Sequence, residues 1–139
     1  MYRAIVWQCR RTAPYIDRLK KAGQAAMIRE RTGLLPDAYF SASKIRWMLD
    51  ELGLQARAER GELCFGTVDS FLAFRLAAGH PHVTDATNAS RTMLVNLKTQ
   101  DWDSELLKLF NIPRALLPEV RDTAGAFGTL DPDILGAPV

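Results

Sequence analysis

Two aromatic residues, Trp7 and Tyr39, are the side chains whose types and positions best suit the binding of a small polyhydroxylated ligand. A polyol has C–H faces that pack on aromatic rings, and its hydroxyl groups need fixed donors and acceptors. Trp7 ends a predicted strand, and Tyr39 comes just before a predicted helix; ligands collect beyond strand ends, and unsatisfied N–H groups gather at helix starts. Packing in the core is the competing interpretation for both residues.

A metal site is the second kind of chemistry that the residue types suggest. His80 and His82 lie two positions apart and could act together with Cys64 or Asp85. Two neighbouring histidines without a second cluster of ligands are more typical of a polar loop. We therefore predict no metal ligand in this chain.

Generic catalytic motifs are absent from the sequence, which has no G-x-x-x-x-G-K-[ST], H-E-x-x-H, G-x-S-x-G or C-x-x-C pattern. A Ser-His-Asp triad could be drawn from many residues here and has no specificity. Residues 125–128 (GAFG) are interpreted as a turn between strands rather than a phosphate loop. The residues thus predict no catalytic and no cofactor-binding side chain.

The elements that must position Trp7 and Tyr39 begin with an apolar run at residues 4–7, predicted as a strand buried on both faces of a parallel sheet. A helix follows, with Thr12 as its cap and Gly23 after its end, and a second helix is predicted over residues 24–31, stopped by Gly33. The basic residues of the first helix should lie on a solvated face; they are Arg18, Lys20 and Lys21.

A third helix is predicted to start at Ser41 as its N-cap and to end at Gly53. Spacings of three, four and seven define its apolar stripe. The stripe consists of Ile45, Met48, Leu49 and Leu52. A different, polar face carries a large aromatic that calls for a partner surface; this face consists of Lys44, Trp47, Asp50 and Glu51.

The second half of the chain is predicted to contain strands at residues 63–65 and 92–95 and helices at residues 67–78 and 101–110. Asp101 or Asp103 should cap the last of these helices. The inward residues of the earlier helix are predicted to be Val68, Phe71, Leu72 and Leu76, and those of the later one Leu106, Leu107 and Phe110.

Composition places the chain among globular proteins: it has 139 residues, 47% of them hydrophobic and 24% charged. So many helices and so few strands would leave the strand at residues 4–7 without partners, so the chain resembles part of a larger α/β domain. We expect a cytoplasmic protein without a membrane span, since no apolar run approaches the roughly 18 to 20 residues required. Cys9 and Cys64 are expected to be reduced, buried thiols.

Residues 39–51 (YFSASKIRWMLDE) resemble the first signature of the FGGY carbohydrate kinases. Residues 4–12 (AIVWQCRRT) and 83–94 (VTDATNASRTML) are similar to the members of that family that act on glycerol, and residues 61–69 and 117–121 add to the likeness. The resemblance runs from about Ala4 to Gly128, nearly the whole chain.

This resemblance implies an actin-like, ribonuclease-H-like α/β fold, and an ATP-dependent transfer of a phosphoryl group to glycerol, giving sn-glycerol 3-phosphate and ADP with the help of Mg²⁺. Trp7 corresponds to an aromatic wall against the glycerol carbons, and Tyr39 to a phenol that hydrogen-bonds a glycerol hydroxyl. Residues of the signature helix such as Lys44 are expected to be structural. Four further residues are expected at most to shape a loop near the substrate: Asp85, Asn88, Ser90 and Arg91.

The same resemblance implies that residues 1–139 form part of the N-terminal, glycerol-binding domain of such a kinase. In the family, a phosphate-binding hairpin and an Arg-Glu pair lie upstream of the matching region, and the general base and the ATP-binding domain lie downstream. We therefore expect the isolated chain to be inactive.

Two alternatives stay open from sequence. One is a related kinase of xylulose, gluconate or another polyol. The other is a non-catalytic binding module whose basic first 31 residues, with eight Lys or Arg against Asp17 and Glu30, bind an acidic partner or nucleic acid. The sequence leaves homo-oligomerisation undecided.

Overall fold

The computed structural model describes residues 3–135, and helices dominate that span. The helices are α1 (Ala13–Lys21), α2 (Ala25–Thr32), α3 (Ser41–Glu51), α4 (Gln55–Glu59), α5 (Val68–Leu76), α6 (Ala86–Ser90), α7 (Ser104–Phe110), the 3₁₀ helix η1 (Arg114–Leu116) and α8 (Pro132–Leu135). The strands are β1 (Val83–Asp85), β2 (Val95–Asn96), β3 (Asp101–Trp102) and β4 (Glu119–Arg121). The prediction of a helix-rich chain with few short strands is confirmed.

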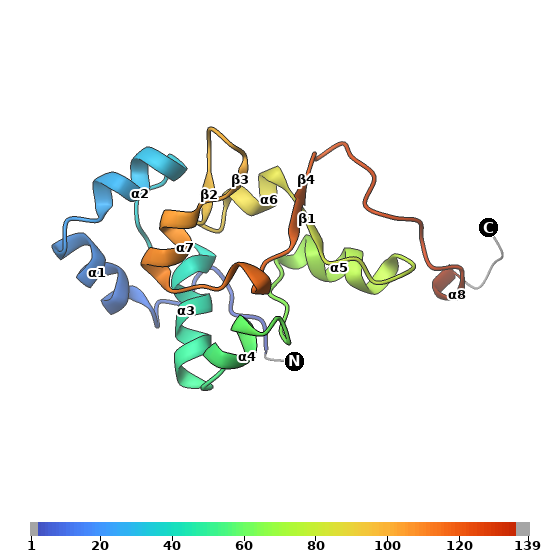
Figure 1. Ribbon diagram of the computed structural model, residues 1–139, viewed down its shortest axis with the longest axis horizontal. Helices are drawn as coiled ribbons and strands as arrows, with labels where there is room; N and C mark the ends of the chain where they lie inside the picture. The colour runs from blue at the N-terminus through green and yellow to red at the C-terminus, as the bar shows by residue number, and fades with distance from the viewer. Residues whose placement is uncertain (1–2, 136–139) are drawn as a thin grey trace.

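The described strands form two small sheets. β1 pairs in parallel with β4, with Val83 opposite Glu119, and β2 pairs antiparallel with β3, with Val95 opposite Trp102. Figure 1 shows the β1–β4 pair at the junction between the main helical body and α5. The sequence did not predict β1, and the predicted strand at residues 92–95 is reduced to β2, which begins at Val95.

The hydrophobic core lies where α1, α2, α3 and α7 meet on one side of the molecule (Figure 1). Each helix contributes a fully buried side chain: Ile16, Ile28, Ile45 and Phe110. The inward residues predicted for the last of these helices, Leu106, Leu107 and Phe110, are confirmed. Burial of this kind stabilises the fold by roughly 1.5 to 3 kcal/mol per large apolar side chain.

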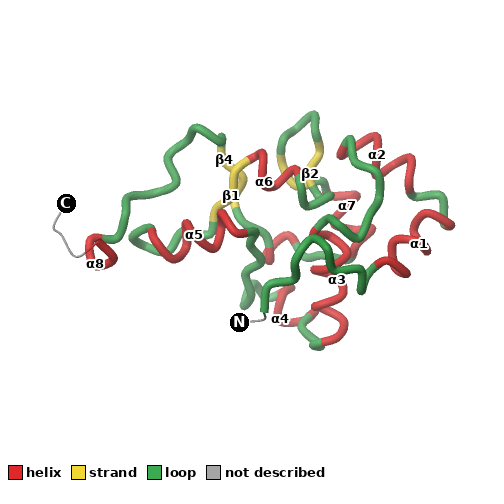
Figure 2. The backbone as a smooth tube through the Cα atoms, turned by 180° about the vertical axis from the view of Figure 1, so that it is seen from behind, coloured by secondary structure: helices red, strands yellow, loops and turns green. Residues whose placement is uncertain are grey.

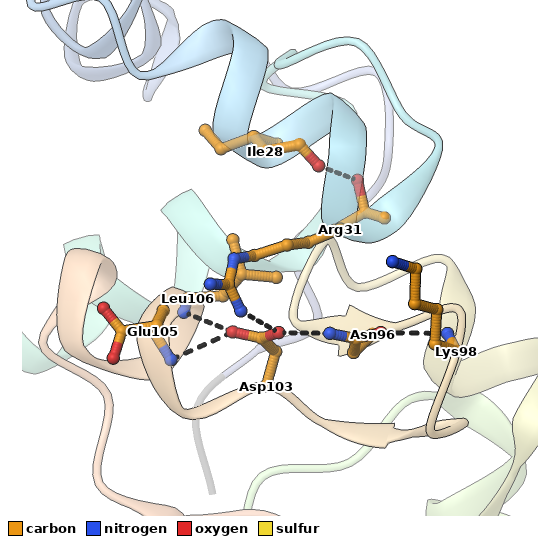
Figure 3. A network of polar contacts seen from close by, with 8 residues as sticks. Ile28, Arg31, Asn96, Lys98, Asp103, Glu105 and Leu106 are labelled. Carbon is orange, nitrogen blue, oxygen red and sulfur yellow. Dashed lines mark hydrogen bonds and ion pairs between the residues drawn. The ribbon is translucent and has the colours of Figure 1, made fainter.

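A polar network around Asp103 fixes the start of α7 against α2 (Figure 3). The Asp103 carboxylate accepts hydrogen bonds from the N–H groups of Glu105 and Leu106 at 2.9 and 3.0 Å. Its other oxygen accepts from Arg31 Nη1 and Asn96 Nδ2, both at 2.7 Å. Burial opposes ionisation, but these bonds outweigh it and lower the pKa of Asp103. The predicted aspartate cap is thus confirmed at Asp103.

α1 and α2 end as predicted, each followed by a glycine in the left-handed region: Gly23 at φ 77° and Gly33 at φ 71°. Thr12 stands at the N-cap of α1 but makes no capping hydrogen bond. Its hydroxyl instead shares a buried 2.8 Å hydrogen bond with the hydroxyl of Ser43. The solvated basic face of α1 is confirmed for the three predicted residues, Arg18, Lys20 and Lys21.

α3 begins one residue earlier than predicted, because Phe40 rather than Ser41 occupies its N-cap. No side chain caps this end; the N–H of Ala42 donates to Thr92 O at 2.9 Å. The helix is followed as predicted by Gly53, at φ 61°.

The predicted faces of α3 are only partly right. Ile45 and Leu49 are buried as expected, but Leu52 is exposed. Two cations take inward positions instead, Lys44 and Arg46, with 5% and 6% of their surface exposed. A spacing pattern that counts only apolar residues misses them, because both chains carry long apolar stems and find polar partners inside.

The segment at residues 4–7 is not a strand, contrary to prediction. Val6 and Trp7 are each 58% exposed, and among the described residues no strand pairs with this segment. A strand buried on both faces requires neighbours on each side; β1 and β4 pair with each other elsewhere. Residues 63–65 likewise are extended without being a strand, although Phe65 N donates to Leu116 O at 2.8 Å.

α5 projects from the helical body, as Figures 1 and 2 both show. The prediction that its apolar residues point inward is wrong. Val68, Phe71, Leu72, Phe74 and Leu76 all have at least 38% of their surface exposed, whereas the residue that α5 buries is Ser70. Periodicity identifies an apolar face, but it does not tell whether anything covers that face.

The tail after β4 returns along α5. Ala78 N donates to Thr129 O at 2.9 Å and Asp131 N to Leu76 O at 2.8 Å, so the tail is hydrogen-bonded to the C-terminal end of α5. The apolar side chains that the tail brings alongside α5, Leu130 and Ile134, are themselves about half exposed, at 49% and 46%. α5 and the tail therefore present apolar surface that the described residues do not bury.

Candidate functional site

The two residues predicted to bind a polyol lie together. The ring centroids of Trp7 and Tyr39 are 5.4 Å apart, and the ring planes are tilted by 50°. Both rings are accessible: Trp7 is 58% and Tyr39 42% exposed. This arrangement presents an apolar wall next to a phenol that both donates and accepts hydrogen bonds, which is the chemistry that a small polyol requires.

Two segments carry this aromatic pair, and polar contacts tie them together. Arg10 Nη1 donates to Asp37 Oδ1 at 2.7 Å, and the same oxygen accepts from the N–H of Tyr39 at 2.7 Å. Burial opposes the ionisation of Asp37, but the bonds from Tyr39 and Arg10 lower its pKa below the usual value. Further along the same segments, the buried Thr12–Ser43 bond fixes α1 to α3.

Lys44 binds the backbone of the loop that carries Tyr39. Its ammonium donates to the backbone carbonyls of Ala38 and Tyr39, the latter at 2.9 Å. Burial lowers the pKa of Lys44. The prediction that Lys44 belongs to a polar face away from the core is therefore wrong. A cation near the start of a helix opposes the helix dipole. This unfavourable position of Lys44 is the one signal in the sequence that points to a special role for this residue.

Arg91 lies against the aromatic ring of Tyr39. Its guanidinium carbon lies 5.0 Å from the ring centroid of Phe40 and 5.8 Å from that of Tyr39, while Phe40 meets Tyr39 edge-on at 5.0 Å. Arg91 is the C-cap of α6. Of the loop residues predicted to lie near a substrate, the structure places Arg91 against the rings of Tyr39 and Phe40.

Asp85, from the same loop, has a different environment. Its carboxylate accepts from the N–H groups of Thr87 and Asn88 and from the hydroxyl of Thr123, the last at 2.6 Å. Burial opposes ionisation, but the bonds from Thr123, Thr87 and Asn88 outweigh it and lower the pKa of Asp85 strongly. Asp85 thereby joins α6 to the segment after β4.

A shallow cavity of about 320 Å³ lies beside Asp85. It is lined by Asp69, Ala73, Asp85, Thr87, Asn88, Thr123 and Phe127. Phe127 belongs to the segment of residues 125–128 that the sequence predicts as a turn between strands. The turn observed here spans residues 122–125 and is closed by a 2.7 Å hydrogen bond from Gly125 N to Asp122 O, whereas residues 126–128 form no turn. The predicted position of the turn is therefore wrong, because the chain turns directly after β4.

Trp47 finds its partner surface in the N-terminal segment. The guanidinium carbon of Arg11 lies 4.5 Å from the Trp47 ring centroid, and Arg11 Nε donates to Cys9 Sγ at 2.9 Å. Hydrogen bonds from Arg11 lower the pKa of the Cys9 thiol. Both cysteines are free as predicted, but neither is buried: Cys9 is half-buried and Cys64 exposed.

The alternative of a metal site receives no support from the described residues, in which no three His, Cys, Asp or Glu side chains are grouped to hold an ion. His80 Nδ1 pairs with Phe74 O at 2.8 Å and His82 Nε2 with Phe65 O at 2.6 Å. Both histidines thus lie in the segment between α5 and β1, each paired with a backbone carbonyl. Within residues 3–135, no helix has the length and apolarity of a membrane span.

Comparison with protein families gives a match over almost the entire chain. The profile described as "FGGY family of carbohydrate kinases, N-terminal domain" matches residues 1–137. Glycerol kinase 1 of Pseudomonas aeruginosa is 62% identical over 137 residues, covering 98% of this chain and 28% of that protein. The glycerol kinase of Methylobacterium nodulans is 59% identical over 140 residues, covering 100% of this chain and 28% of that protein. The chain thus spans 28% of the length of these curated relatives.

Solved structures with a similar fold are also carbohydrate kinases. The crystal structure of Plasmodium falciparum glycerol kinase with ADP superposes with a TM-score of 0.89 at 32% identity, covering 94% of this chain and 26% of that one. The ligand-bound xylulose kinase from Lactobacillus acidophilus has a TM-score of 0.85 at 24% identity over 99% of this chain and 28% of that one, a likeness of fold alone.

Proposed function

The chain belongs to the FGGY family of carbohydrate kinases, and on that premise we propose that it supplies the substrate-binding wall of an ATP:glycerol phosphotransferase. Such an enzyme moves the γ-phosphoryl group of ATP to a terminal hydroxyl of glycerol, giving sn-glycerol 3-phosphate and ADP. The single observation that carries the proposal is the 5.4 Å pairing of Trp7 with Tyr39.

The fold agrees with this premise: the described residues are a piece of the actin-like, ribonuclease-H-like α/β fold that their structural neighbours share. In that setting the Trp7 ring packs against the carbon backbone of glycerol. The Tyr39 phenol exchanges hydrogen bonds with a glycerol hydroxyl, while Lys44 bonds the Tyr39 backbone carbonyl and Arg91 lies against the Tyr39 ring. A fixed orientation of the reacting hydroxyl is the main contribution that a protein makes to phosphoryl transfer.

The phosphate side of the reaction lies outside what these residues provide. Kinases of this family use ATP together with a divalent metal ion, which would neutralise charge on the phosphates. Among the described residues no three His, Cys, Asp or Glu side chains are grouped to hold an ion, and we assign none of them to Mg²⁺. We therefore propose that the isolated chain does not phosphorylate glycerol.

The exposed face of α5 supports the view that residues 1–139 are one part of a longer kinase's N-terminal domain. Its apolar side chains, among them Phe71 and Leu72, are left about half exposed, and the curated relatives are several times longer. We propose that additional polypeptide covers this face. The proposal includes a cytoplasmic location, since ATP is available there and the two free thiols suit a reducing compartment.

Glycerol is preferred over other polyols because the relatives with 54–62% identity are glycerol kinases. The xylulose and gluconate kinases resemble the chain at 24% and 23% identity. Those sibling activities, and a binding module that uses the basic face of α1, are outcomes for the experiment to distinguish.

The test is an NMR titration of the chain, with its aromatic rings isotope-labelled, with glycerol, xylulose, gluconate and a short DNA duplex. Because only one side of the ligand is contacted, we expect glycerol to shift the Trp7 and Tyr39 ring signals with a dissociation constant on the order of millimolar. Xylulose or gluconate binding more tightly would favour a sibling kinase. In a second sample with labelled backbone amides, salt-dependent shifts confined to Arg18, Lys20 and Lys21 on adding DNA, with no response of the rings to glycerol, would favour the binding module.

A coupled assay of ADP release completes the test. The unmodified chain, freed of contaminating kinase, should release no ADP when ATP, Mg²⁺ and glycerol are supplied. Glycerol-dependent ADP release by that sample would contradict the proposal that this chain binds glycerol but does not phosphorylate it by itself.

A further inference from the structure

We propose that Lys44 is a positioning residue, which fixes the backbone carbonyls of Ala38 and Tyr39 and so aims the Tyr39 phenol beside Trp7. The identity of the ligand rests on the proposed function, whereas the positioning itself does not. Lys44 lies near the start of α3, a short distance along the chain from Tyr39. Its side chain folds back to the loop that precedes the helix.

The contacts of Lys44 are concentrated on the loop of Tyr39. The side chain is 5% exposed, and its ammonium donates to two consecutive carbonyls, those of Ala38 and Tyr39. Ala38 is itself buried, at 1% exposed. Two hydrogen bonds to adjacent peptide groups fix the orientation of both peptide planes, and hence the direction in which the Tyr39 side chain leaves the backbone.

Burial of this ammonium has no simple structural benefit. No carboxylate lies within ion-pair distance of Lys44 Nζ in the part of the chain that the structure describes. A buried charge without a carboxylate partner is unfavourable, and near a helix N-terminus a cation also opposes the dipole. A methionine of similar size would fill the space at no such penalty. What the lysine adds is the pair of donors that hold the loop.

The charge of Lys44 also reaches both segments of the site. Its charge acts on Cys9 in the Trp7 segment and on Asp37 in the Tyr39 loop. Next to it on α3, Ser43 bonds Thr12 and so ties the same two segments one step further along the chain. Lys44 therefore holds the Tyr39 loop next to the point where the Ser43–Thr12 bond joins the two segments.

Arg46 offers a matched control on the same helix. It is 6% exposed, as deeply buried as Lys44, yet its guanidinium donates to Asp50, Gln55 and the carbonyl of Asn111, none of which touches the aromatic pair. Lys44→Met and Arg46→Met each remove one buried cation from α3 and leave an apolar side chain. If burial alone mattered, the two substitutions would affect Tyr39 alike.

The experiment records the ring NMR signals of Tyr39, assigned through Tyr39→Phe, in the whole 139-residue chain without ligand. In the unmodified chain, we expect the Trp7 ring current to displace these signals from free-tyrosine values and to give a cross-relaxation contact between the two rings. Lys44→Met should move the signals toward free-tyrosine values and remove the contact. Lys44→Arg should restore part of both, whereas Arg46→Met should leave both in place at a temperature where it is folded.

A displaced Tyr39 signal that persists in Lys44→Met would overturn the proposal, and so would an equal loss in Lys44→Met and Arg46→Met. If circular dichroism finds Lys44→Met unfolded, Lys44→Gln replaces it; its shorter amide should give the same direction of change, and an unchanged Tyr39 signal there would again overturn the proposal. In the same samples, Lys44→Met should weaken glycerol binding about tenfold. No glycerol response in the unmodified chain would refute the proposed function, and the ring signals would then decide the role of Lys44 on their own.

Discussion

The rings of Trp7 and Tyr39 meet at a centroid distance of 5.4 Å although α1 and α2 separate them in the chain. Neither residue belongs to the hydrophobic core. Their pairing depends on polar ties between the two segments, of which the Arg10–Asp37 ion pair is exposed and the Thr12–Ser43 bond is buried. Exposed ion pairs contribute little, about 0 to 1 kcal/mol, so the buried ties around α3 dominate the placement of the two rings.

The Cys9 thiol should ionise at a lower pH than an ordinary cysteine. Arg11 donates to Cys9 Sγ at 2.9 Å and stabilises the thiolate, which lowers the pKa of Cys9. The rate of alkylation at Cys9, followed by mass spectrometry against pH, should therefore rise with a midpoint below that of an ordinary cysteine. Arg11→Gln should move that midpoint upward and leave the alkylation of the exposed Cys64 unchanged. An unaltered Cys9 profile in Arg11→Gln would refute the assignment.

Asp85 should make the fold sensitive to acid. Its folded pKa is lowered by hydrogen bonds that outweigh burial, so its stabilising contribution is fully present above an unfolded value of about 3.9 and is lost as the pH falls below that value, toward the lowered folded pKa. Asp85→Ala should lower the free energy of unfolding at neutral pH by about 2 kcal/mol, measured by urea titration.

The control for acid sensitivity is Asp17→Asn, which alters an exposed carboxylate of α1. It should leave the pH dependence of stability intact, whereas Asp85→Ala should flatten the fall between about pH 4 and pH 2. Equal acid sensitivity in Asp85→Ala and the unmodified chain would show that other carboxylates are responsible.

Asp103 should matter for α7 through its two distinct roles. Asp103→Ala removes both the N-cap of α7 and the bonds to Arg31 and Asn96, and we expect a loss of about 2 to 3 kcal/mol. Asp103→Asn keeps an oxygen that can accept from the backbone, so its loss should be smaller. Thermal unfolding followed by circular dichroism measures both. If Asp103→Asn lowers stability as much as Asp103→Ala does, the ion pair with Arg31 contributes more to stability than the helix cap does.

Much of the fold could be predicted from sequence where one segment carries all the information. α7 is an example, because Asp103 and the spacing from Leu106 to Phe110 specify a cap and a buried face within a single short segment. The glycines that end α1, α2 and α3 work in the same way. Local chemistry of this kind needs no knowledge of distant segments.

What could not be predicted depends on contacts between segments. The face of α5 with Phe71 and Leu72 has an apolar pattern that is the same whether or not a partner covers it. Lys44 was assigned to a polar face because spacing alone does not reveal that its stem packs inward. The approach of Trp7 to Tyr39 was expected only through family resemblance, since no local rule joins residues on either side of two helices.

The apolar face of α5 leads to a prediction of its own. Leu72 is 47% exposed, so Leu72→Ser should change the free energy of unfolding of this chain by no more than about 0.5 kcal/mol. Leu106→Ser, at a fully buried core position, should cost several times as much, roughly 2 to 5 kcal/mol. Equal losses of stability would mean that α5 buries Leu72 in solution.

Glycerol affinity of Tyr39→Phe, measured by the NMR titration against the matched variant Tyr15→Phe, bears most directly on the role of the aromatic pair. Tyr15 packs on Phe110 at 6.0 Å, on the core side of α1, so its hydroxyl is not expected to touch a ligand. We predict that Tyr39→Phe weakens glycerol binding about tenfold by removing one positioned hydrogen bond, while Tyr15→Phe binds as the unmodified chain does. Undiminished glycerol affinity in Tyr39→Phe, in a folded sample, would contradict the assignment of this site.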